Sequence, residues 1–146
     1  MAYRGTFEYT LDAKNRLTVP PKFRAGFAEG VVVARRIDNP RCLSLWRPEE
    51  YESYSQAALA TLAPLSPRRT ELERFLFAKS HDTELDSAGR VMIPADPLRV
   101  LTGEREVVIT GAGQCLEVWS QAAWSEYDST LATAVSDFTS TLDAAA

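Results

Sequence analysis

The alternation of apolar and polar residues predicts that the chain contains two similar units. Thr6–Leu11 has an apolar residue at every second position, which is typical of a half-buried strand. A polar turn follows, and then a second strand-like segment, Arg16–Val19. The same succession returns later in the chain, where TELDSAGRVMIP at residues 83–94 matches YTLDAKNRLTVP at residues 9–20. We therefore expect a duplicated supersecondary unit.

The spacing between the two copies is nearly constant. Asp12, Arg16 and Pro20 recur 74 residues later as Asp86, Arg90 and Pro94. Cys42, Trp46 and Tyr54 recur 73 residues later as Cys115, Trp119 and Tyr127. The single-residue difference indicates one insertion or deletion between the two blocks.

The turn after the first strand has the same backbone requirement in both copies. Asn15 occupies the position that Gly89 has in the second copy. Asn and Gly are the two residues that best accept the left-handed conformation. We expect each turn to close a tight hairpin, as a type I turn with a bulge, so that the second strand returns beside the first.

The remaining pattern completes each unit as β-β-α-β-β-α. Short helices are predicted after Pro20 and Pro94, buried strands at 31–33 and 107–109, and fourth strands ending at Trp46 and Trp119. Pro48 suits the first position of a helix, and Ser66 and Ser120 are candidate N-caps. The C-terminal helix has an apolar stripe suited to packing on the body or on a neighbouring subunit: Trp124, Tyr127, Leu131, Val135, Phe138 and Leu142.

These elements predict an α+β fold. Two tandem repeats would form one closed, β-barrel-like body with a pseudo-twofold axis and peripheral helices, because two small hairpins cannot bury their faces alone. The expected division is residues 1–63 for the first repeat, 64–80 for a helical connector, and 81–146 for the second repeat with its C-terminal helix.

Composition favours a globular, intracellular protein. The 146 residues are 45% hydrophobic and 25% charged. The start of the chain has no apolar signal-like region, and no run approaches the length of a membrane span, so we expect a cytoplasmic protein without a membrane partner. Cys42 and Cys115 lie in apolar strand runs, which favours buried, reduced thiols. Trp46 and Trp119 end such runs and are expected in the core.

The net charge of −4 conceals an asymmetry. Residues 1–47 carry nine Lys/Arg against four acids, a formal charge of +5, and the remainder carries −9. DNA binding requires a local basic patch rather than a basic protein. The charge distribution is therefore compatible with one face that binds a polyanion.

The residues give little support for catalysis. His81 is the single histidine and is expected in a linker, with no Cys or second His at a metal-ligand spacing. The chain has no glycine-rich phosphate loop or nucleophile elbow. We expect no enzyme activity, metal, cofactor or small-molecule substrate.

The repeated Asp-x-x-x-Arg element is the main candidate site, and two interpretations remain open. Asp12 and Asp86 can order their turns while Arg16 and Arg90 pair with them, which would be a structural role. Alternatively, each arginine opens a strand beside a turn and can direct a planar donor fork towards phosphate. The recurrence of the element in the same strand-turn-strand-Pro context strengthens the second interpretation.

The segment GTFEYTLDAKNRLTVPPKFR, the second LDSAGRVMIP, and the Trp-containing strand with its following helix resemble the MraZ family of bacterial transcriptional regulators. This family belongs to the AbrB/MazE-like swapped-hairpin group, and the resemblance covers about Tyr3 to Tyr127. It implies two AbrB-like halves, ring-shaped homo-oligomers, and binding to repeated DNA boxes upstream of the division and cell-wall gene cluster. The family motifs fall on Asp12/Arg16 and Asp86/Arg90. Asn15 stands where the family usually has Gly.

We therefore predict a sequence-specific, nucleoid-associated regulator that binds double-stranded DNA as a homo-oligomer. The first repeat should be the principal DNA reader, because the second interposes Asp96 among its basic residues. The predicted DNA-binding residues are Lys14, Arg16, Lys22, Arg24 and Arg90. The predicted turn-structuring residues are Asp12, Asn15, Asp86 and Gly89. An alternative is an antitoxin-like protein-interaction module with autoregulatory DNA binding.

Overall fold

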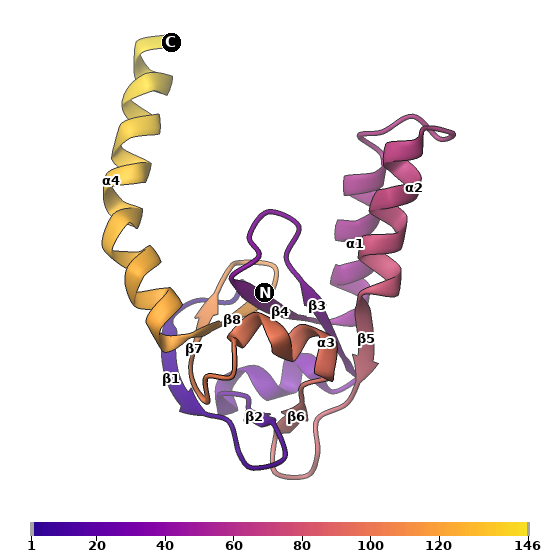
Figure 1. Ribbon diagram of the computed structural model, residues 1–146, viewed down its shortest axis with the longest axis vertical. Helices are drawn as coiled ribbons and strands as arrows, with labels where there is room; N and C mark the ends of the chain where they lie inside the picture. The colour runs from indigo at the N-terminus through magenta and orange to yellow at the C-terminus, as the bar shows by residue number, and fades with distance from the viewer. Residues whose placement is uncertain (1, 146) are drawn as a thin grey trace.

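The computed structural model describes residues 2–145, and its main feature is an open, six-stranded antiparallel sheet (Figure 1). Across this sheet the strands run in the order β1 (Thr6–Thr10), β7 (Glu106–Gly111), β8 (Leu116–Ser120), β4 (Cys42–Trp46), β3 (Val31–Arg35) and β5 (Ser80–Thr83). A second sheet contains only β2 (Arg16–Thr18) and β6 (Arg90–Met92). The fold is therefore α+β, as the sequence predicts.

The helices lie around these two sheets. In chain order they are η1 (Pro21–Phe27, 3₁₀), α1 (Pro48–Leu59), α2 (Pro67–Glu73), η2 (Arg74–Ala78, π), α3 (Ala95–Leu98), η3 (Arg99–Leu101, 3₁₀) and α4 (Gln121–Ala145). The predicted caps are confirmed: Pro48 begins α1, and the Ser66 and Ser120 hydroxyls accept hydrogen bonds from the backbone N–H groups of Arg69 and Ala123. The order strand-strand-helix-strand-strand-helix occurs once on each side of α2 and η2.

The predicted local hairpins are wrong in their strand pairing. Within residues 2–145, β1 pairs with β7 and β2 pairs with β6, so that each turn leads from the large sheet into the small one. In the same way, β5 pairs with β3 rather than with β6. The turn residues determine that the chain reverses, whereas the partner of each strand depends on apolar burial. The valine-rich strands β3 and β7 are buried and take neighbours on both sides.

The register relates the two repeats by a pseudo-twofold axis. Leu17 pairs with its own equivalent, Val91, at the centre of the small sheet. Ser44 pairs with its equivalent, Glu117, where β4 meets β8. Tyr9 faces Val107, and the equivalent Thr83 faces Val31. Val31 thus corresponds to Val107, an offset of 76. The offset between the repeats therefore rises by two residues before β3 and β7 and falls by three after them. The single-residue difference seen in the sequence is the net result of these two length changes.

The expected closed, barrel-like body is not formed. Within residues 2–145 the large sheet ends at β1 on one side and β5 on the other. β2 and β6 are three residues each and pair only with one another in the described sheets, so they cover one face of the large sheet without joining its edges. They are too short to bridge those edges.

Two hydrophobic clusters hold the layers together. The larger lies between the two sheets and includes Leu17, Val33, Val91 and Ile109, all 0% exposed. The second lies on the other face of the large sheet beneath α1 and α2, around Trp46 and Tyr51. The Tyr51 hydroxyl donates a hydrogen bond to the Leu76 carbonyl at 2.6 Å, which connects α1 to η2.

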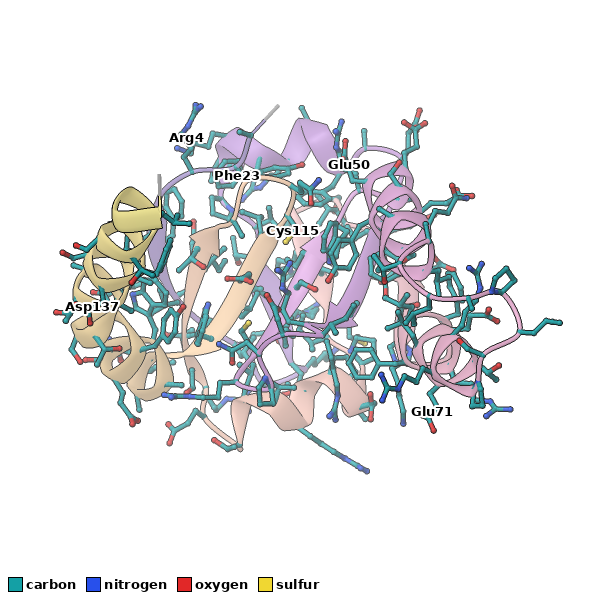
Figure 2. The ribbon with its side chains drawn as sticks, turned by 90° about the horizontal axis from the view of Figure 1, so that it is seen from above. Arg4, Phe23, Glu50, Glu71, Cys115 and Asp137 are labelled. Carbon is teal, nitrogen blue, oxygen red and sulfur yellow. The ribbon has the colours of Figure 1, made fainter. Side chains whose placement is uncertain are left out.

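The cysteines and tryptophans are placed as predicted. Cys42 and Cys115 are free thiols with 0% exposed area, and Cys115 lies near the middle of the sheet in Figure 2. Trp46 and Trp119 are 1% and 2% exposed, which confirms a core role. His81 is not in a linker, because it lies in β5 opposite Val33. The segment Ser80–Thr83 is short and polar, so nothing in its sequence predicts a strand without its partner β3.

The C-terminal helix α4 packs against the body through the stripe residues of its first turns. Trp124 and Tyr127 contact Trp119 with ring centroids 5.4 and 5.0 Å away. Beyond them α4 extends away from the sheet (Figure 1), and Phe138 and Leu142 are 55% and 61% exposed. Among residues 2–145, none of the helices combines the length and apolar character required to cross a membrane.

Candidate nucleic-acid interface

The two Asp-x-x-x-Arg turns lie side by side at one end of the body. In Figure 1 they form the two loops below β2 and β6, opposite the end from which α4 and the α1–α2 pair project. Asn15 and Gly89 have φ angles of 59° and 76°, so the predicted left-handed positions are confirmed. Each turn is closed by a backbone hydrogen bond from residue 15 or 89 to the carbonyl of its aspartate, 3.0 Å long in both.

Reciprocal backbone bonds connect the two turns. The N–H of Val19 donates to the Gly89 carbonyl at 2.9 Å, and the N–H of Ile93 donates to the Asn15 carbonyl at 3.0 Å. These two bonds are equivalent under the pseudo-twofold axis. They extend the β2–β6 pairing to the base of the turns and hold both turns in one rigid unit.

Each aspartate organises its own turn. One carboxylate oxygen of Asp12 accepts the backbone N–H groups of Lys14 and Arg16, both at 2.9 Å, and the other accepts Arg16 Nε at 2.6 Å. Asp86 repeats this with the N–H groups of Ala88 and Arg90 and with Arg90 Nε, all at 2.9 Å. Both aspartates therefore make the hydrogen bonds within the turn that the structural interpretation of the motif describes.

These hydrogen bonds change the acidity of the carboxyl groups. The backbone N–H of Arg16, with smaller contributions from its guanidinium and the Lys14 N–H, lowers the pKa of Asp12 to about 2. The backbone N–H of Arg90 is the main cause that lowers the pKa of Asp86. Both groups are thus anionic acceptors at neutral pH.

The motif arginines are held in place and still reach solvent. Their side chains are 26% exposed for Arg16 and 33% for Arg90. Arg90 Nη1 also lies 3.8 Å from a carboxylate oxygen of Asp12 in the other turn. Because the Nε of each arginine donates to its aspartate, each guanidinium is already oriented before a ligand binds. This orientation favours planar recognition of phosphate or a guanine edge.

The structure separates the other predicted DNA-binding residues. Lys14 is exposed on the first turn. Arg24 lies at the second turn, where its guanidinium covers Gly89 and its Nε donates to the Val19 carbonyl at 2.9 Å. A Cβ on Gly89 would collide with that guanidinium. Lys22 instead lies over two aromatic rings, with Nζ 5.1 Å from the Phe7 ring centroid and 5.0 Å from that of Phe23.

One basic residue at the turns was missed from the sequence. The Arg105 carbonyl accepts the N–H of Leu11 at 2.8 Å, and its guanidinium donates to the Asp12 carbonyl. Arg105 precedes β7 and lies 93 positions from Asp12. No local pattern could have identified it, since the β1–β7 pairing brings the two residues together.

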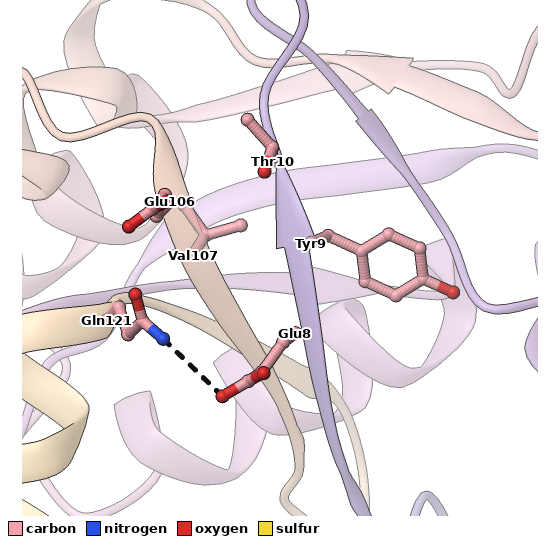
Figure 3. Close-up of a pocket in the computed structure, with 6 residues that line it drawn as sticks. All are labelled: Glu8, Tyr9, Thr10, Glu106, Val107 and Gln121. Carbon is pink, nitrogen blue, oxygen red and sulfur yellow. Dashed lines mark hydrogen bonds between the residues drawn. The ribbon is translucent and has the colours of Figure 1, made fainter.

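Two adjoining surface hollows lie at the base of α4. Figure 3 shows one of about 160 Å³ at the base of α4, where Gln121 Nε2 donates to Glu8 at 3.4 Å. An adjoining hollow of about 540 Å³ is bordered by the carboxylates of Glu8, Glu104, Glu106 and Asp128. Within residues 2–145 no group of three or more His, Cys, Asp or Glu is arranged to hold a metal ion.

Comparison with known proteins agrees with the repeated architecture. A family model described as "MraZ protein, putative antitoxin-like" matches the chain over residues 2–71 and again over 76–144. Proteins named Transcriptional regulator MraZ are similar along most of their length. The relative from Kocuria rhizophila is 39% identical over 127 residues, covering 86% of this chain and 85% of its own.

Two further relatives have the same name. The protein of Thermoanaerobacter sp. (strain X514) is 34% identical over 123 residues, with 84% of each chain covered. The protein of Mycoplasmoides gallisepticum is 34% identical over 124 residues, with 85% of each chain covered. With the two equivalent turns and a family model that matches both halves, these similarities show that the chain belongs to the MraZ family.

Proposed function

We propose that the protein is a sequence-specific DNA-binding transcriptional regulator and not an enzyme. The observation that carries this proposal is the pair of turns side by side, with Arg16 and Arg90 each fixed by its aspartate. The relatives are named as transcriptional regulators, which supports the same conclusion. We retain the division into residues 1–63, 64–80 and 81–146 as part of this proposal.

The turns can supply both kinds of DNA contact. Lys14 and Arg16 on the first turn suit insertion into the major groove, where Arg and Lys favour guanine at about 1–3 kcal/mol per good contact. Contacts to phosphate add affinity that is independent of sequence. The preorganised guanidinium groups lose little conformational freedom on binding, so the aspartates contribute indirectly to affinity.

A homo-oligomer, in the form of a ring, is the second part of the proposal. A single pair of turns makes few contacts, and several copies acting on repeated promoter boxes would gain affinity through multivalency. The exposed stripe of α4 supports assembly, because Val135, Phe138 and Leu142 are 42%, 55% and 61% exposed. The arms formed by α4 and α1–α2 project away from the turns, which leaves the DNA-facing end open (Figure 1).

We further propose a cytoplasmic, nucleoid-associated location and a promoter upstream of the division and cell-wall genes as the target. An antitoxin-like protein-interaction module is the second candidate, favoured by the description of the matching family and by the exposed face of α4. In that case the same face would bind a different protein.

A footprint with purified protein on the DNA upstream of its own gene tests the proposal. We expect several protected boxes at a regular spacing, which appear together as protein is added. A uniform, sequence-independent coating of the DNA, or the absence of protection at low salt, would contradict it. A single protected box would support DNA binding and contradict the ring.

A further inference from the structure

We propose that Arg105 is a phosphate-contacting residue that the second repeat contributes to the first turn. This inference rests on the proposed DNA-binding function and names a residue for it. Arg105 is exposed, and its backbone and side chain are both bound to the segment Leu11–Asp12. It therefore belongs to the same rigid tip as Lys14 and Arg16 and adds a third cation there.

The direction of the Arg105 side chain distinguishes it from the acids beside it. Glu104 and Glu106 border the hollow at the base of α4 together with Glu8 and Asp128. Arg105 instead reaches the Asp12 carbonyl in the turn. The alternation of side chains along an extended segment thus sends the two carboxylates to one side and the guanidinium to the other.

The equivalent position in the first repeat has the opposite charge. Because Val31 corresponds to Val107 in the strand register, Arg105 corresponds to Glu29. Glu29 borders a hollow together with Asp82 and Glu84, the residues that lead into the second turn. The pseudo-twofold axis therefore relates the cation Arg105 to the carboxylate Glu29.

This charge difference makes the end of the body that carries the two turns electrostatically asymmetric. The two sequence motifs alone do not show this asymmetry. A DNA backbone that crosses the two turns is attracted by Lys14, Arg16 and Arg105 at the first turn, whereas the position equivalent to Arg105 at the second turn carries the negative charge of Glu29. Arg90 and Arg24 remain at the second turn. The Arg24 guanidinium covers Gly89, and its Nε donates to the Val19 carbonyl. We infer that the phosphates lie towards β1 and β7 rather than towards β5.

The test measures the salt dependence of DNA binding for full-length variants. Replacement of Arg105 by Gln should weaken binding to operator and unrelated DNA by the same factor, and lower the slope of log K against log salt by about 1 for each protomer bound. Arg105→Lys should restore the slope, because it keeps the charge. Arg99→Gln, an exposed arginine on η3, is the matched control and should leave the slope unchanged.

The variant Glu29→Lys probes the equivalent position at the second turn, and should raise affinity and increase the slope. Thermal unfolding of each variant shows whether the substitution changes the stability of the fold. A structural role for Arg105 predicts that Arg105→Gln lowers the unfolding temperature and that Arg105→Lys fails to restore DNA binding. Wild-type affinity and slope for Arg105→Gln, with Arg16→Ala inactive, would overturn the inference alone. Failure of the wild-type protein to bind DNA would overturn both proposals.

Discussion

Leu17 and Val91 face each other across β2 and β6 at equivalent positions of the two repeats, and both side chains are fully buried. This pair lies on the pseudo-twofold axis, directly behind the two turns. The position of each turn therefore depends on the packing of the other repeat.

The first prediction concerns this pair. Leu17→Ala should reduce the free energy of unfolding by about 2–5 kcal/mol, because it removes buried methylene and methyl groups and leaves a cavity between the sheets. Urea unfolding followed by tryptophan fluorescence measures the change. Leu65→Ala is the matched control, since Leu65 is 96% exposed. Equal stability of the two variants would contradict the role of the pair.

The second prediction tests the motif arginine. Arg16→Ala should abolish specific operator binding in a gel shift and leave the oligomer intact, because its side chain lies in the turn and hydrogen-bonds to Asp12 of the same turn. Arg90→Ala should have a smaller direct effect. Equal operator binding by Arg16→Ala and wild type would show that the first turn is not the principal reader.

The third prediction concerns acid. The Asp12 carboxyl has a pKa of about 2 in the fold against an ordinary value of 3.8, so the unfolded chain binds more protons between these values. The contribution of this group to stability is therefore complete above about pH 4 and is lost as the pH falls towards 2. In urea unfolding from pH 5 to 2, Asp12→Asn should show a flatter dependence than wild type.

A matched carboxylate outside the turns serves as the control for that experiment. Asp128→Asn removes a carboxylate on α4, outside the turns, and a dependence as flat as that of Asp12→Asn would show that the loss of any carboxylate is sufficient. Asp86→Asn should behave like Asp12→Asn, since the Arg90 backbone N–H lowers the pKa of Asp86. An identical pH dependence for all four proteins would refute the proposed origin of the acid sensitivity.

The fourth prediction concerns assembly. Phe138→Asp should lower the oligomer mass in light scattering, because a charge in the exposed stripe of α4 opposes burial against another subunit. Ser136→Asp adds the same charge two positions away from the stripe residue and should preserve the mass. An unchanged mass for Phe138→Asp would exclude this face from the subunit contact.

The fifth prediction concerns the thiols. Burial raises the pKa of Cys115 to about 12, and it also raises the pKa of Cys42. Since the thiolate is the reactive form, neither cysteine should react with a thiol reagent in the native protein within minutes. Both should react on unfolding in urea, and fast modification of the folded protein would disprove their burial.

The sequence by itself determined the elements that depend on neighbouring residues. The left-handed turns at Asn15 and Gly89, the caps at Ser66 and Ser120, and the buried strands around Val32 and Val108 all follow from local conformational preference and apolar periodicity. The duplication further determined that these elements occur twice, and indicated the family. Local hydrogen bonds and side-chain sterics operate over a few residues, which is why a sequence pattern can predict them.

The tertiary structure alone decided which strands pair and which charges meet. The exchange of β1 and β5 between the repeats, the open sheet and the placement of His81 in β5 depend on burial between distant segments. The same pairing brings Arg105 to the first turn and Arg24 to the second. Apolar burial has no preferred sequence separation, so no local pattern specifies these partners.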